Sequence, residues 1–218
     1  SLTGIATING GNNVDVNAGT QAVNIVVGTT TAAAGAVTIV GDGGVAGATM
    51  GAITATGGTS ISATQTATDH AVNTTATHGV MTLTGNASTT AVTAIQSAAA
   101  TANAAVEAAA GTAAEAAVRG VVNGVVTIAD ASAGTAVANT ISDVTITNAG
   151  AATVNSNALA NLNLSGTITS VNTTNTSTAA TAAVTTLNLN VDDLTTTGAV
   201  TADPEVTTLN VAGSNAAS

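Results

Sequence analysis

The sequence predicts an all-β protein: a right-handed β-solenoid of stacked parallel coils, forming a single segment over residues 1–218. Short alternating runs of Val, Ile and Thr recur along the chain, one strand motif repeats at nearly fixed spacing, and Phe, Tyr, Trp and Cys are all absent. Aromatic side chains supply much of the buried area of an ordinary core. A core without them must be thin and built from small aliphatic side chains.

The alternating runs are four to six residues long and end at Gly, Asn, Asp or Ser. This pattern is typical of strands separated by turns, and roughly fifteen such runs favour a sandwich, a barrel or a solenoid. Clear examples cover residues 5–9, 23–27, 36–40, 80–84, 125–128 and 144–147.

A repeated strand motif favours the solenoid among these three. Asn-Leu-Asn-Leu at 161–164, Leu-Asn-Leu-Asn at 187–190 and Leu-Asn-Val at 209–211 are versions of one strand. Repeats at this period indicate stacking, so we expect the Leu residues at 162, 187 and 209 to share one interior stack. Alternation turns Leu and Val inward and leaves Asn and Thr outside, in ladders between coils. At about 22 residues and about 4.8 Å per coil, the rod would be about 50 Å long.

Two segments interrupt the strand pattern. Residues 98–119 are rich in Ala, the best helix former, and Glu115 stands four residues before Arg119, so we expect a short helical insertion there. A disordered Ala-rich loop is the alternative, because an isolated helix this short is marginal. Pro204, the single proline, lies between Asp203 and Glu205 and predicts a turn between two strands.

The charge balance excludes several classes of partner. The net charge is −10 with one basic residue, so the chain lacks the Lys and Arg that bind nucleic acid or an anionic membrane. The chain contains no stretch of 18 apolar residues, so the sequence predicts no transmembrane helix. The chain opens Ser-Leu-Thr, without a basic and apolar leader, so we expect it to be a fragment of a longer protein whose targeting signal lies elsewhere.

Candidate catalytic residues are few. The chain has two histidines, His70 beside Asp69, and His78, so a Ser-His-Asp catalytic triad is one interpretation. A triad is recognised by its geometry, however, and nothing in the sequence supports one. Two His without Cys make a zinc site equally improbable. The Gly-rich run at 41–44 lacks the Gly-Lys-Ser ending of a phosphate loop, and turns explain it adequately. We therefore expect no enzyme.

The carboxylates are the stronger signal for a binding site. Calcium takes six to eight oxygen ligands from carboxylates, carbonyls, Asn and water, and stacked turns present such oxygens in rows. Residues 10–16 partly match the Gly-Gly-x-Gly-x-Asp calcium nonapeptide, although its third Gly is missing. Adjacent carboxylates also repel each other unless a cation intervenes, which ranks the pair at 192–193 first. The predicted calcium ligands are Asp192, Asp193, Asp42, Asp130, Asp143, Asp203, Asp15 and Glu205.

The Thr-, Ala-, Gly- and Asn-rich sub-repeats resemble the RTX-type, type I-secreted surface-layer (S-layer) proteins of stalked bacteria. The similar stretches occur in the family's order and include Leu-Thr-Gly-Asn-Ala-Ser-Thr-Thr and Leu-Asn-Leu-Asn-Val. They cover residues 71–75, 83–93, 122–128, 162–167, 187–191, 194–201 and 209–214.

The resemblance implies a lattice-forming β-solenoid domain, stabilised by Ca²⁺ and without enzymatic activity. It implies a secreted protein that assembles with copies of itself on the outer membrane, in an extracellular surface layer. Anchoring to lipopolysaccharide would use a region not in this chain. The family's intact glycine-rich nonapeptides and its secretion signal are also not represented.

Two other readings remain open. A β-solenoid adhesin or binding module has the same fold, but usually displays exposed aromatic side chains. A polysaccharide-degrading parallel β-helix usually needs acids with Arg or Lys on one face. Regular self-assembly on addition of calcium would separate the surface-layer reading from both.

Overall fold

A computed structural model describes residues 4–19, 21–43, 49–68, 75–98, 120–178 and 184–214. Within these ranges it contains 16 strands and no helix, so no helix of the described chain is long and apolar enough to cross a membrane. Every strand pair is parallel, and 14 strands belong to one sheet. The prediction of an all-β protein with parallel strands is confirmed.

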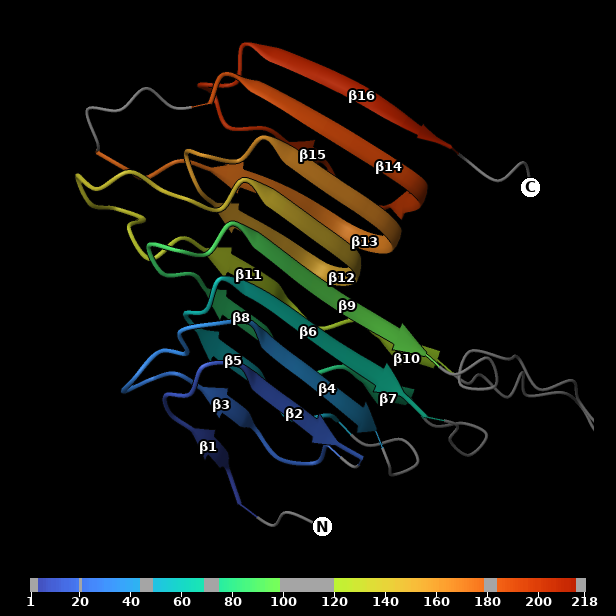
Figure 1. Ribbon diagram of the computed structural model, residues 1–218. Helices are drawn as coiled ribbons and strands as arrows, with labels where there is room; N and C mark the ends of the chain where they lie inside the picture. Colours follow the sequence, from blue (N-terminus) through green and yellow to red (C-terminus); the bar gives the residue numbers. More distant parts are fainter. Residues whose placement is uncertain are drawn as a thin grey trace, which may run out of the picture.

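The sheet curls so that two arms lie against each other (Figure 1). The first arm contains β2 (Val14–Ala18), β4 (Val37–Gly43), β6 (Ser60–Ala67), β9 (Ala91–Ala98), the first parts of β12 (Asp143–Asn155), β13 (Asn161–Thr174) and β14 (Thr186–Thr196), and β16 (Thr208–Ser214). The second arm contains β1 (Ala6–Ile8), β3 (Ile25–Val27), β5 (Ile53–Thr56), β8 (Met81–Thr84), β11 (Val126–Ala129), the later parts of β12 and β13, and β15 (Val200–Thr201).

Three further features define how the strands are connected. The strands β12 and β13 run from the first arm into the second, with a shift of register between Thr147 and Ala149 where β12 bends. Strands β7 (Thr75–Thr77) and β10 (Gly120–Val122) form a separate two-stranded sheet. The chain alternates between the arms, so each coil, meaning the chain from one first-arm strand to the next, stacks on the one before. This arrangement is compatible with a β-solenoid.

The core lies between the two arms and consists of small aliphatic side chains. On the first arm, aligned inward positions hold the fully buried Ile61, Val92, Val144 and Leu162. On the second arm, Met81 and Val126 occupy the equivalent positions. Burying one such side chain contributes about 1.5–3 kcal/mol. The core therefore needs no aromatic residue because every coil adds several aliphatic side chains to it.

The predicted interior stack of Leu162, Leu187 and Leu209 is wrong, because the pairing register between the first two of these strands differs from the prediction by two residues. Leu162 pairs with Leu189, not with Leu187, and Leu187 pairs with Leu209. All of them remain on the inward side because a shift of two residues conserves the face. The aligned motif is instead the outward asparagine at 161, 188 and 210.

The coils are also less regular than a 22-residue period. Val14 and Val37 are 23 residues apart, whereas Val92 and Val144, also neighbours in the first arm, are 52 apart. The eight strands of the first arm span about 34 Å at about 4.8 Å per step, so the estimate of about 50 Å was too long. Residues 99–119, which carry the predicted helical insertion, lie outside the described residues, and Ala98 ends strand β9.

Candidate functional site

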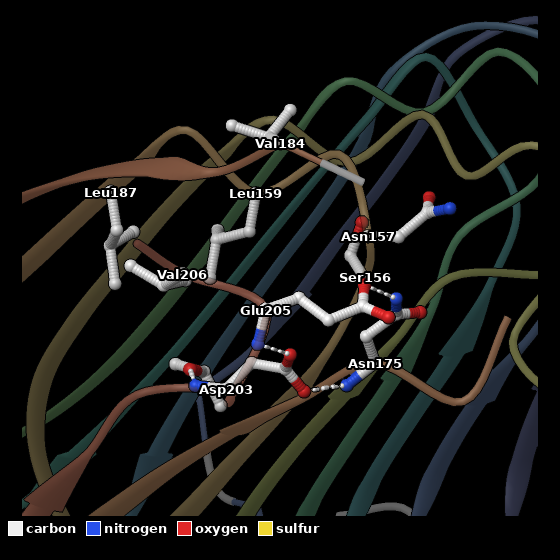
Figure 2. Close-up of a pocket in the computed structure, with 10 residues that line it drawn as sticks. Ser156, Asn157, Leu159, Asn175, Val184, Leu187, Asp203, Glu205 and Val206 are labelled. Carbon is white, nitrogen blue, oxygen red and sulfur yellow. Dashed lines mark hydrogen bonds between the residues drawn. The ribbon is translucent and has the colours of Figure 1, made fainter. Parts of the chain in front are cut away.

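Two of the eight predicted ligands lie together, in the turn between β15 and β16 that the proline predicts. Asp203 Oδ1 accepts the main-chain N–H of Glu205 (2.9 Å), and Asp203 Oδ2 accepts that of Asn175 (2.6 Å). Asn175 Nδ2 then donates to Glu205 Oε2 (2.6 Å). Figure 2 shows these carboxylates pointing toward the same small cavity as Asn175.

This cavity has an apolar side and a polar side. Leu159, Leu187 and Val206 line the first, and Ser156 and the two carboxylates line the second (Figure 2). Its volume of about 20 Å³ admits about one water molecule. The space is therefore suited to a single small ligand, such as a water molecule or an ion, rather than to an organic substrate.

The residues fit a calcium ion only in part. Calcium requires six to eight oxygens, and three of the four carboxylate oxygens of Asp203 and Glu205 already accept an N–H bond. An ion here would share those oxygens and take its remaining ligands from main-chain carbonyls or water. Among the described residues, no three His, Cys, Asp or Glu side chains gather closely enough to form a metal-binding group.

The adjacent pair Asp192 and Asp193 lies on the exposed side of β14. Asp192 Oδ1 accepts the hydroxyl of Ser214 on β16 (2.5 Å). Asp193 has a φ of 47°, in the left-handed region, at the point where the pairing of β13 with β14 changes register. Both residues are exposed at this irregular point of the strand, where the alternation of inward and outward side chains is interrupted.

Asp130 has a different environment, because it is buried. Its carboxylate accepts Ser132 Oγ (3.0 Å) and N–H (3.4 Å), Thr140 N–H (2.6 Å) and Ile141 N–H (2.8 Å). Asp130 follows strand β11 directly, and Thr140 and Ile141 precede β12. The side chain therefore ties together the two ends of the loop that connects the arms.

The three remaining predicted ligands are separate from one another. Asp143 begins β12 and accepts bonds from Asn161 Nδ2 (2.6 Å) and Ser142 Oγ (2.5 Å). Asp15 is exposed on β2, and Asp42 pairs with Thr66 near the end of β4. The structure thus groups Asp203 with Glu205 around Asn175, places Asp192 and Asp193 on β14 as chain neighbours, and keeps the other four acids apart.

The predicted outward ladders are present. Asn210 Nδ2 donates to Asn188 Oδ1 (2.9 Å), and Asn188 Nδ2 donates to Asn161 Oδ1 (3.0 Å). The row ends on Asp143, which accepts from Asn161. All amides of this row, which we call the Asn ladder, donate toward the N-terminal end of the stack.

A buried amide column was not predicted. Gln21, Gln65 and Gln96 are all almost completely buried at one edge of the core. The Nε2 atoms of Gln21 and Gln65 both donate to Gly51 O (2.9 and 2.8 Å), and Gln96 Nε2 donates to Gly79 O (3.2 Å). The alternation Ile61-Ser-Ala-Thr-Gln65 contains the missing signal, because Gln65 has the inward phase of Ile61.

His78 lies beside this column, 2% exposed, and Asp69 and His70 lie outside the described residues. The Nε2 atom of His78 lies 2.8 Å from Ser97 O, and Nδ1 lies 3.2 Å from Asn123 Oδ1. Asn123 Nδ2 donates to Thr167 O (3.2 Å), which fixes the orientation of that amide. These contacts make His78 a bridge between β9 and the segment after β10.

We expect His78 to make the fold sensitive to mild acid. Burial lowers the pKa of His78 below 6.5, and the hydrogen bonds to Ser97 and Asn123 offset this only in part. Below pH 6.5 the unfolded chain therefore binds a proton that the folded chain does not, and the free energy of unfolding falls until the pH reaches the folded-state pKa. Above pH 6.5 this contribution is constant. Urea unfolding of the wild type and His78→Gln across pH 5–8 measures it.

The matched control is His70→Gln, which removes the other histidine. The His78→Gln variant should lose the fall in stability just below pH 6.5, relative to its own value at pH 8, while the control retains it. An identical pH slope in the wild type and His78→Gln would contradict the assignment.

A scan against protein-family models and a search of curated proteins return no match for this chain.

Proposed function

We propose that this chain is a structural constituent of a secreted, calcium-dependent bacterial surface layer, in which copies assemble into a two-dimensional lattice on the outer membrane. Its coils would wind in the right-handed sense, with the Ala-rich segment as a helical excursion. The observation that carries the proposal is the stack of parallel strands with outward rows of small polar side chains.

The lateral surface supports a repetitive contact. Along the second arm, one outward row contains Thr54, Thr82, Thr127 and Thr153 on four successive coils. The Asn ladder lies on the first arm. Contacts through such rows would be polar and modest in area, which suits a lattice whose order comes from many weak, repeated contacts rather than from one large apolar interface.

The acidic pairs support a role for calcium. With 11 carboxylates and one basic residue in the chain, cations are the only abundant partners for this charge. The acids at 203/205 are the best-placed ligands, because both line the same cavity, and Asp192 and Asp193 are consecutive exposed residues of β14. Both pairs lie at the C-terminal end of the stack. Binding there would hold β14, β15 and β16 together.

We expect calcium to raise the melting temperature of the chain. Ligand that binds only the folded state stabilises it by about 2.7 kcal/mol at a hundredfold excess over Kd. Differential scanning calorimetry with calcium and with chelator measures the shift, and magnesium should substitute poorly because it demands a tighter octahedral shell. The double variant Asp203→Asn/Glu205→Gln should lose most of the shift. Asp15→Asn, which removes an isolated exposed carboxylate, serves as the control.

Assembly is tested by negative-stain electron microscopy of the chain with added calcium. Ordered arrays that disappear with chelator support the surface-layer function. A monomeric chain that instead binds a glycan or a protein with calcium would favour the alternative, a β-solenoid adhesin or binding module. A melting curve indifferent to both calcium and chelator would contradict the calcium proposal.

A further inference from the structure

A polar cavity lies at the corner where the first arm turns into the second. Strands β12 and β13 cross this corner directly, and Asn148 takes a φ of 52° in the bend of β12. In earlier coils the chain instead forms the short strands β7 and β10 at this corner, which His78 and Asn123 follow directly. A cavity of about 380 Å³ lies at the step between the two kinds of corner. It therefore belongs to the middle of the stack, away from the first and last coils.

The residues around this cavity form a closed hydrogen-bonded ring. Asn148 Nδ2 donates to Gln96 O (2.6 Å), and Thr167 N–H donates to Asn148 Oδ1 (2.8 Å). Asn123 Nδ2 donates to Thr167 O (3.2 Å), and His78 continues the ring from Asn123 Oδ1 to the residue after Gln96. All the members of the ring line the cavity. Their polar groups are thus held in fixed orientations before any ligand binds.

His78 is the point where the ring lacks a proton. Its Nε2 lies 2.8 Å from Ser97 O and its Nδ1 lies 3.2 Å from Asn123 Oδ1, so both nitrogens face oxygens that only accept. A neutral imidazole carries a single N–H. The shorter contact assigns this proton to Nε2, which leaves the lone pair of Nδ1 facing the Asn123 oxygen. Turning the Asn123 amide over would only move the conflict to Thr167 O, which that amide now bonds.

A cation between Nδ1 and Oδ1 removes this conflict, and a metal ion fits the gap better than a proton. Burial lowers the pKa of His78, which disfavours the imidazolium at neutral pH. Two ligand atoms that each lie about 2.1 Å from one ion, at a right angle, are about 3 Å apart. The observed separation is 3.2 Å. In addition, a metal-binding histidine typically donates its other N–H to a carbonyl or carboxylate, as Nε2 does to Ser97 O.

We propose that this cavity binds a divalent transition-metal ion, such as Zn²⁺, through His78 Nδ1 and Asn123 Oδ1. An imidazole ligand favours such an ion over Ca²⁺ and Mg²⁺, which prefer oxygen. Gln96 lines the same cavity, fully buried, and its Oε1 has no hydrogen-bond partner among the described residues. Water completes the coordination, as in zinc sites that keep an open position. The net charge of −10 attracts cations to the protein.

This site is independent of the acids proposed to bind calcium, and it shares no residue with them. A count of His, Cys, Asp and Glu misses it among the described residues, because it combines one histidine with amide oxygens. The sequence argument against zinc counted His and Cys in the same way, and it still holds for a closed site with four protein ligands. The inference therefore goes beyond the proposed function.

Nitrogen-15 NMR of the histidine rings tests the site, because the chain contains only two histidines. At pH 8 without metal, His78 should carry one N–H, on Nε2. Adding Zn²⁺ should shift the Nδ1 resonance of His78 and leave Nε2 protonated, whereas Ca²⁺ should shift neither nitrogen. The spectrum of His70→Gln assigns the two rings, and the ring of His70 in the wild type serves as the internal comparison.

Two matched variants measure the contribution of the amide oxygen. Losing a group that only orients a metal ligand weakens binding about 10–100-fold, so Asn123→Ala, which removes a ligand, should weaken Zn²⁺ binding about tenfold or more. Asn188→Ala removes an amide from the Asn ladder instead and should bind Zn²⁺ like the wild type. Titration calorimetry gives the affinities. His78→Gln should abolish binding, and if that variant does not fold, the NMR titration of the wild type still decides.

The outcomes separate this site from the calcium proposal. Protons on both ring nitrogens of His78 at pH 8, or on Nδ1 alone, would overturn the inference, because neither state leaves a lone pair for the ion. A Zn²⁺ titration that shifts only His70, or wild-type affinity in Asn123→Ala, would do the same. Stabilisation by calcium without any response of His78 to Zn²⁺ would leave the surface-layer function intact. The reverse result would leave only the transition-metal site.

Discussion

Replacing Asp130 with Ala should lower the free energy of unfolding by about 4 kcal/mol. The carboxylate receives three main-chain N–H groups and one hydroxyl in a buried site at the end of β11. Truncation leaves Thr140 and Ile141 with donors that face an apolar methyl group, and each unsatisfied buried donor costs about 1–3 kcal/mol. The connection between the two arms would then lose its anchor. Urea unfolding at pH 7, with the calcium concentration fixed, measures the difference.

The control for Asp130→Ala is Asp15→Ala, which removes the same charge from an exposed position on β2. Exposed substitutions of this kind change stability by about 0.5 kcal/mol or less. Asp130→Asn should fall between the two, because it conserves one acceptor but turns an NH₂ group toward main-chain donors. If Asp130→Ala and Asp15→Ala were equally stable, the carboxylate would have no structural role. A loss that appears only in calcium would indicate a metal ligand instead.

The strands and their inward faces could be predicted from the sequence, because alternation and turn residues are local signals. The run at 36–40 lies at the start of β4, which continues to Gly43. The run at 125–128 matches β11 within one residue at each end. The Pro204 turn between two strands is likewise confirmed. Each depends on a few neighbouring residues, and no tertiary contact had to be known.

The register between coils could not be read in the same way. The leucines at 162, 187 and 209 recur at a nearly constant spacing, which predicts that they are aligned. The structure instead aligns the asparagines at 161, 188 and 210, because Leu162 and Leu187 differ by two positions in their coils. Both alignments bury leucine equally well, so hydrophobic pattern alone does not distinguish them. The side-chain hydrogen bonds of the Asn ladder favour the alignment that is found.

The candidate site shows the same division between local and distant information. Acids in turns were recognisable one at a time, but their grouping depends on which turns are stacked. Asp130 and Asp203 both follow strands, yet the first is enclosed by main-chain donors and the second opens on a small cavity beside Glu205. The buried Gln column was missed because amide side chains are normally exposed, although Gln65 has the inward phase.

The sequence predicts a turn at the glycine run 41–44, but residues 41–43 belong to strand β4, and glycines elsewhere have a packing role. Three successive coils place Gly51, Gly79 and Gly124 one above the other, just before strands β5, β8 and β11. A Cβ on Gly79 would lie 2.0 Å from Gly51 O, and one on Gly124 would lie 2.3 Å from Gly79 O. The absence of a side chain lets one coil approach the backbone of the next, and the buried Gln amides then bond the same carbonyls.

Gly79→Ala should therefore destabilise the chain by about 3 kcal/mol, the upper range for overpacking a closely packed core. The added methyl group meets main-chain atoms of Gly51 and Met50, which cannot rotate away as a side chain would. The coils must separate at this corner, which also weakens the bond from Gln96 Nε2 to Gly79 O. Gly120→Ala, where the nearest atoms lie 3.9 Å away on the Thr75 side chain, should leave stability unchanged or slightly raised. Equal urea midpoints for the two variants would show that the glycine column does not set the spacing of the coils.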